Sequence, residues 1–107
     1  YQKLLIDQAI MECMTNCARH AGGTRVFVKI TNNKVLCKVQ ITNNGKKPAE
    51  GSQEGGGLTS LRKTVEREGG KMQVIFSPEF ELILLLSHEK DREIKSSEEV
   101  TVKILNS

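Results

Sequence analysis

Three polar side chains near the start of the chain, Glu12, Asn16 and His20, recur at every fourth residue. On a helix this spacing stacks them along one face, about one residue's rotation from the apolar positions Cys13 and Cys17. A carboxylate, an amide and an imidazole beside a core could bind a metal ion or move a proton. The same three side chains could equally form a plain solvated helix face, so this segment alone leaves both interpretations open.

The second feature suited to chemistry is the glycine triplet Gly55, Gly56 and Gly57, which lies immediately before a predicted helix. Backbone amides at a helix start carry partial positive charge, and without side chains around them they can bind phosphate. The alternative is a flexible loop that needs glycine only for its turn. The triplet and the polar face of the first helix are together more specific than either feature alone.

Apolar periodicity predicts the helices that would position these residues. One helix is expected over residues 4–21, ended by Gly22-Gly23. A second helix is expected to begin at Leu58 and to end at Gly69-Gly70. The residues expected on the buried faces are Ile6, Ile10, Cys13 and Cys17 in the first helix and Leu58, Leu61 and Val65 in the second.

Alternating apolar and polar residues predict four strands, over residues 25–30, 34–42, 71–76 and 80–87. Asn32-Asn33 suits a tight turn between the first two, because asparagine tolerates positive φ. Val35, Cys37, Val39 and Ile41 are expected on one face of the second strand. Residues 43–57 lack periodicity and predict a loop. We therefore expect a two-layer α/β sandwich in which both helices cover one face of a mixed sheet.

Composition limits the class of protein. The 107 residues suffice for one domain with one core, and the odd number of cysteines, three, argues against a disulfide framework and for the cytoplasm. No apolar run approaches the ~20 residues of a membrane-spanning helix. The net charge of +3 is small and the basic residues are scattered without aromatic interleaving, which argues against nucleic-acid binding.

The two ends of the chain differ from its middle. The sequence opens with Tyr1 inside a predicted helix, so we expect it to be a piece of a longer protein. The domain proper is expected over residues 1–87, followed by a charged tail over residues 88–107 with an edge strand near residues 99–105. Cys13, Cys17 and His20 could also be drawn as a zinc site, but the two cysteines continue the apolar stripe and are better explained as core.

Taken in order, the motifs resemble the ATPase domain of bacterial sensor histidine kinases, in the subgroup with a short lid. The resemblance covers residues 4–87. The matching motifs are Glu12-x-x-x-Asn16-x-x-Arg19-His20-Ala21, Asn43-Asn44-Gly45, Gly55-Gly56-Gly57-Leu58-x-x-Leu61-Arg62 and Gly69-Gly70. Each motif is weak alone, and the ordered combination is specific.

The resemblance implies a role for each matched position. Asn16 would hold Mg²⁺ through its side-chain oxygen, with the ion bridging the phosphates of ATP. Glu12 would act near the metal as a base or orienting acceptor. The remaining nucleotide-binding positions would be Arg19 and His20 at the phosphates, Asn43 and Gly45 at the adenine, and Gly55, Gly57 and Leu58 at the start of the second helix.

The implied function is to supply the phosphoryl group for histidine autophosphorylation in two-component signal transduction. The implied partners are ATP, the dimerisation and phosphoacceptor-histidine domain of the same protein, and a response regulator. The full-length protein would be a membrane-associated homodimer.

Two positions depart from the family pattern. Asn43 stands where the family usually has an aspartate that accepts a hydrogen bond from the adenine amino group, and Lys47 replaces a second glycine. These departures favour an alternative, an interaction module of the same fold that has lost ATP binding. An anti-sigma-factor type of serine kinase is the other alternative.

Overall fold

The computed structural model describes residues 2–48, 55–87 and 97–103, and describes side chains for the same residues except 2, 20, 21 and 97–103. The elements are α1 (Gln2–Asn16), a π-helical turn η1 (Cys17–Ala21), β1 (Arg25–Asn32), β2 (Leu36–Asn43), α2 (Gly56–Arg67), β3 (Lys71–Ile75), β4 (Glu81–Ser87) and β5 (Ser97–Lys103). None of the helices in these ranges is long and apolar enough to cross a membrane.

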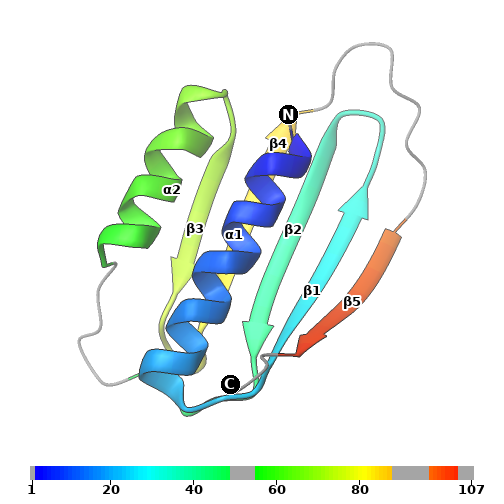
Figure 1. Ribbon diagram of the computed structural model, residues 1–107. Coiled ribbons are helices and arrows are strands. Elements are labelled where there is room, and N and C mark those ends of the chain that lie inside the picture. The colour runs from blue at the N-terminus through cyan, green and yellow to red at the C-terminus, as the bar shows by residue number, and fades with distance from the viewer. Residues whose placement is uncertain (1, 49–54, 88–96, 104–107) are drawn as a thin grey trace.

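The elements form two layers, one of helices and one of strands. Five strands make a single sheet in the order β3-β4-β2-β1-β5, and α1 and α2 lie side by side across one face of it (Figure 1). The expected two-layer α/β sandwich, with both helices on one face, is confirmed.

The direction of the strands corrects one expectation. We predicted a mixed sheet, but each of the four strand pairs in the described residues is antiparallel. The crossover through α2 returns the chain to the same end of the sheet and makes β3 parallel to β2. The next strand, β4, then inserts between them and runs against both, so no two parallel strands are neighbours.

β5 comes from the charged tail and pairs with β1 at one edge of the sheet. The register joins Val26 to Val102 and Val28 to Val100. The strand begins two residues earlier than the predicted 99–105, and residues 104 and 105 lie outside the described residues. The tail therefore contributes a strand to the same sheet as the preceding residues.

The core lies between α1, α2 and the helix-facing side of the sheet. The sheet contributes alternate residues, as expected for strands with one face buried. The buried residues are Val26, Val28, Cys37, Val39, Ile41, Met72, Leu82, Leu84 and Leu86 from the strands and Leu5, Ala9, Cys13, Cys17, Leu58, Leu61 and Val65 from the helices. The face predicted for the second helix is thereby confirmed.

The buried row of α1 corrects the predicted stripe. Leu5 and Ala9, rather than Ile6 and Ile10, continue the row of Cys13 and Cys17. Ile6 and Ile10 are half-buried and pack against the margin of the core. The physical reason is steric, because a small residue at the centre of the contact lets the helix axis approach the sheet and larger residues then fill the sides.

The turn between β1 and β2 is built by a side chain instead of by positive φ. β1 extends to Asn32, and Oδ1 of Asn33 accepts hydrogen bonds from the amides of Val35 and Leu36 at 2.8 and 2.7 Å. No residue other than glycine has positive φ in the described ranges, so the predicted backbone conformation was wrong. Val35 belongs to this turn and is 68% exposed, which also removes it from the predicted buried face.

Burial controls the chemistry of the three cysteines, which are all free thiols in the core. Desolvation raises the pKa of Cys13 from its ordinary value of 9.0 to about 12, and the negative charge of Glu12 adds to the rise. Desolvation also raises the pKa values of Cys17 and Cys37. The thiols are therefore core residues, as the sequence indicated.

The raised pKa of Cys13 predicts a loss of stability in base. Above pH 9.0 the unfolded chain releases the thiol proton while the folded chain retains it until about pH 12, so the free energy of unfolding falls over this range. Urea unfolding at a series of pH values measures the slope. Cys13→Ala should show a shallower decline than the wild type, and an equal slope in the two proteins would contradict the prediction.

Candidate functional site

The polar face of α1 ends in a change of helix type. The α-helical part ends at Asn16, and the wider turn η1 follows and is capped by Gly22 with φ 62°. The sequence predicted one helix through residue 21 and had no signal for the π turn, a feature often found at functional sites. Arg19 is exposed on this turn, and the side chain of His20 lies outside the described residues.

Glu12 and Asn16 are half-buried on the part of α1 that keeps regular geometry. No hydrogen bond is found between the Asn16 carboxamide and any other described side chain or backbone group, so within this part of the chain its oxygen can accept a ligand. Among the described residues, no group of three or more His, Cys, Asp or Glu side chains is placed to hold a metal ion. A cation at Asn16 would need most of its ligands from a bound molecule.

The start of α2 offers backbone amides without side-chain competition. Gly55 is the N-cap residue, no side chain caps the helix, and its first turn contains no acidic residue. A Cβ atom placed on Gly55 or Gly56 would have no atom of the described residues within 4 Å. Leu58 is 3% exposed and anchors this turn in the core, so it can offer only its backbone to a ligand. Among residues 2–48 and 55–87, the start of α2 is therefore open, as the triplet predicted.

The two predicted features meet at Glu12 and Gly57. The Glu12 carboxylate lies directly over the α-carbon of Gly57, in the position where a Cβ atom would stand, and its Cδ would be 2.8 Å from such an atom. The packing of α1 beside α2 brings them together (Figure 1). A carboxylate on one helix thus lies against the amide end of another.

A third part of the site, the segment after β2, is held by Asn44. Oδ1 of Asn44 accepts hydrogen bonds from the amides of Thr24 and Arg25, each at 2.9 Å, and Nδ2 donates to the hydroxyl of Thr24 at 3.2 Å. The amide of Asn44 also donates to the carbonyl of Arg25 at 3.1 Å. One side chain therefore joins the entry of β1 to the exit of β2.

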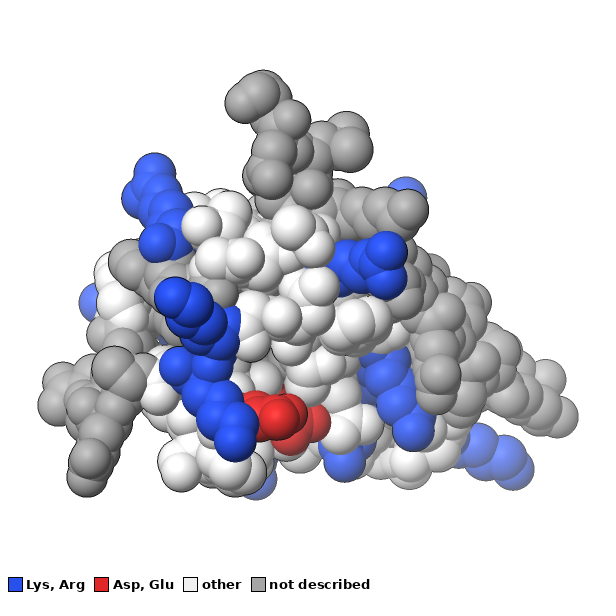
Figure 2. Space-filling model, turned by 90° about the horizontal axis from the view of Figure 1, so that it is seen from below, with Lys and Arg blue, Asp and Glu red and all other residues white. Residues whose placement is uncertain are grey.

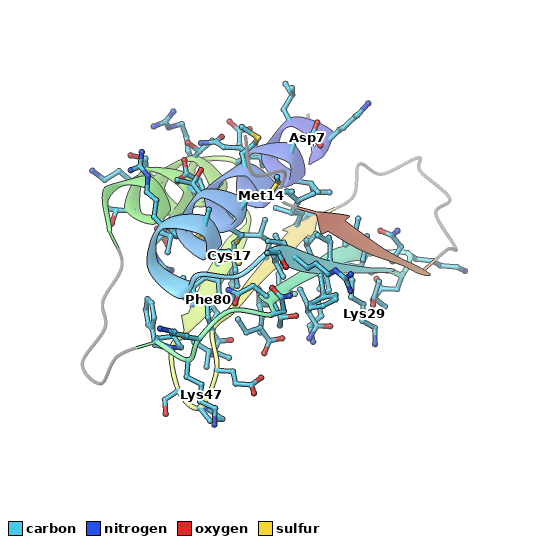
Figure 3. All side chains as sticks on the ribbon, turned by 60° about the horizontal axis from the view of Figure 1, so that its bottom comes forward. Asp7, Met14, Cys17, Lys29, Lys47 and Phe80 are labelled. Atoms are coloured by element: carbon cyan, nitrogen blue, oxygen red, sulfur yellow. The ribbon has the colours of Figure 1, made fainter. Side chains whose placement is uncertain are left out.

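Gly23 lets these two segments approach closely. A Cβ atom on Gly23 would stand 2.8 Å from both Oδ1 of Asn44 and the amide nitrogen of Gly45. Beneath them, Cys17 points into the space between the end of α1 and the sheet (Figure 3). Sequence reasoning missed Asn44 and this role of Gly23, because neither the spacing nor the residue types distinguish them from ordinary turn residues.

Asn43 has a partner within its own turn. Its Oδ1 accepts a hydrogen bond from the amide of Gly45 at 2.8 Å. The oxygen expected to face an adenine amino group is thus engaged with the backbone, and the side-chain amide remains as a donor. Lys46 and Lys47 follow and are exposed, and Lys47 points away from the sheet (Figure 3).

Basic side chains surround this end of the molecule. Figure 2 shows Lys and Arg side chains at several points around it, whereas the acidic side chains in view gather in one place. Residues 49–54 of the loop predicted over residues 43–57 lie outside the described residues.

In sum, the structure places Glu12 beside Gly57, with Asn16 one turn further along α1. Asn43 is the last residue of β2, and Gly45 lies just beyond the strand, next to Gly23. Comparison with models of known protein families finds no match for this chain.

The hydrogen bonds of Asn44 predict a specific cost of substitution. Asn44→Ala should lower the free energy of unfolding by about 1–2 kcal/mol, because two backbone amides lose their acceptor. Asn44→Asp, which keeps the acceptor oxygen, should lower the free energy of unfolding by distinctly less. Denaturant unfolding of the three proteins measures both, and equal losses in the two variants would contradict the role given to the acceptor.

Neighbouring glycines of α2 provide a matched pair. Gly56→Ala should leave stability unchanged or raise it by up to about 1 kcal/mol, because alanine is the better helix former and open space surrounds the position. Gly57→Ala must displace the Glu12 carboxylate and should be less stable than Gly56→Ala. Thermal unfolding compares the two, and equal stability would show that Glu12 moves away without cost.

Proposed function

We propose that this chain binds Mg-ATP as the catalytic domain of a sensor histidine kinase. The observation that carries the proposal is the contact between Glu12 and Gly57, since it joins the polar face of α1 to an uncapped, glycine-rich helix start. A carboxylate beside an anion-binding amide end suits a reaction on a phosphate chain.

Each part of the site has a distinct task under this proposal. The amides of Gly56 and Gly57 bind phosphate oxygens, and Asn16 offers its side-chain oxygen to a Mg²⁺ ion that arrives with the nucleotide. Glu12 orients the attacking group or accepts its proton. Arg19 offsets negative charge from the exposed turn. The oxygen ligands and amide donors fit a magnesium nucleotide, and Mg²⁺ would supply charge neutralisation between its phosphates.

The base would lie near the segment after β2. Gly45 lets the backbone pass close to a flat ring, and Asn43 presents its side-chain amide. His20 keeps its place in the proposal, although its side chain is not described. Catalysis would rest on positioning of the nucleotide. The acceptor histidine would come from another domain. The proposed partners are a dimerisation domain of the same protein and a response regulator, and the setting is the cytoplasmic side of a membrane-associated homodimer.

A second candidate is an interaction module of the same fold without nucleotide binding. The observation that favours it is the hydrogen bond from the Gly45 amide to Oδ1 of Asn43. This bond engages the oxygen that would recognise adenine, and asparagine lacks the charge that would strengthen such recognition. The two candidates differ in one measurable property, the affinity for nucleotide.

Calorimetric titration with ADP and ATP, with and without Mg²⁺, tests the proposal. The wild type should bind saturably in the presence of Mg²⁺, and Asn16→Ala should bind at least about tenfold more weakly because the ion loses its protein ligand. Thr15→Ala, an exposed neighbour on the same helix, should bind as the wild type does. Absence of binding at millimolar nucleotide by a folded protein would overturn the proposal in favour of the interaction module.

A further inference from the structure

The carboxylate of Glu12 packs against the α-carbon of Gly57, which lies 45 positions later in the chain. Both carboxylate oxygens of Glu12 lie within 3.2 Å of the place where a Cβ atom of residue 57 would stand. The adjacent glycines Gly55 and Gly56 have no such neighbour. Gly57 is therefore the one member of the triplet at which the missing side chain admits another group.

The carboxylate also lies where α2 has no anion of its own. The first turn of α2 contains no acidic residue and no side-chain cap. Glu12 is half-buried between the helices and forms no hydrogen bond within the described residues. Its negative charge thus stands beside the positive end of the helix dipole without being bound tightly to it.

Resting on the proposed function, we propose that Gly57 is a positioning residue that holds Glu12 at the phosphate-binding end of α2 and thereby makes nucleotide binding depend on Mg²⁺. A phosphate oxygen bound to the first-turn amides must come close to this carboxylate. The phosphate and the Glu12 carboxylate are both negatively charged, so they repel each other at this short distance. A divalent cation between them removes the repulsion, whereas a nucleotide without Mg²⁺ meets it in full.

The dependence on Mg²⁺ separates this role from a structural one. The quantity to measure is the ratio of the Kd for ADP without Mg²⁺ to the Kd with Mg²⁺, by calorimetric titration. A substitution that only loosens the site weakens both affinities and leaves the ratio unchanged. A substitution that removes or displaces the carboxylate strengthens Mg²⁺-free binding relative to Mg²⁺-bound binding and lowers the ratio.

Four variants test the coupling. Glu12→Gln should lower the ratio by about tenfold, the order expected for removing one like charge from a partly exposed site. Gly57→Ala should lower it in the same direction, because the methyl group displaces the carboxylate. The double variant should show no larger fall than Glu12→Gln alone, since both changes act through one contact. Glu66→Gln removes an exposed carboxylate from the last turns of α2 and should leave the ratio as it is in the wild type.

A fifth variant keeps the test decisive if Gly57→Ala does not fold. Glu12→Asp retains the charge but withdraws it from Gly57, and it should lower the ratio as well. Two outcomes overturn this inference alone. In the first, Glu12→Gln leaves the ratio unchanged. In the second, Glu12→Gln lowers the ratio, but both Gly57→Ala and Glu12→Asp leave it unchanged. Failure of the folded wild type to bind ADP with Mg²⁺ overturns the proposed function, and this inference with it.

Discussion

The close packing of α1 against the sheet is the constraint on which the candidate site depends. Leu5, Ala9, Cys13 and Cys17 form the buried row, and the small side chains at positions 9, 13 and 17 keep the helix axis near the strands. This placement determines how far Glu12 and Asn16 project. They lie one residue before each cysteine along the helix, so they face α2 and the end of the sheet instead of the core or open solvent.

Missing side chains are the second recurring element of the site. Gly57 admits the Glu12 carboxylate, and Gly23 admits the carboxamide of Asn44. In both places two segments distant in sequence approach until an ordinary Cβ atom would overlap its neighbour. The third part, the start of α2, uses glycine differently, because no other described residue approaches Gly55 or Gly56 closely. Glycine at this end of the molecule thus serves both close packing and access.

The elements could be predicted from the sequence because each has strong local signals. The period of Leu58, Leu61 and Val65 gave the second helix its buried face, and alternation located the strands. The site was predicted in part, since the spacing of Glu12 and Asn16 showed a common face but could not show that Gly57 lies beneath it. Contacts between distant segments, such as Asn44 with Thr24 and Arg25, leave no periodic trace.

The differences between the predicted elements and the structure have similar causes. Ala9 was overlooked as the centre of the α1 contact because the larger apolar residues Ile6 and Ile10 lie beside it and continue to the cysteines with helical spacing. The strand directions were misjudged because the insertion of β4 between β2 and β3 is decided by the whole sheet, and no single segment records it. The turn after β1 was predicted from positive φ, whereas hydrogen bonds to the side chain of Asn33 form it.

The pairing of β5 with β1 means that the sheet is closed by residues about 70 positions away in sequence from their partners. β1 is an inner strand only while these late residues are present. If the chain ended at residue 87, the amides and carbonyls along Arg25–Asn32 would form an open edge, able to pair with a strand from another molecule. In the intact sheet β5 is the edge strand on this side, with Glu98, Glu99 and Lys103 in its sequence, and charged residues on an edge strand disfavour pairing with other chains. Because the pairing of β1 with β5 closes the longest loop in the sheet, it should be among the last contacts to form as the chain folds.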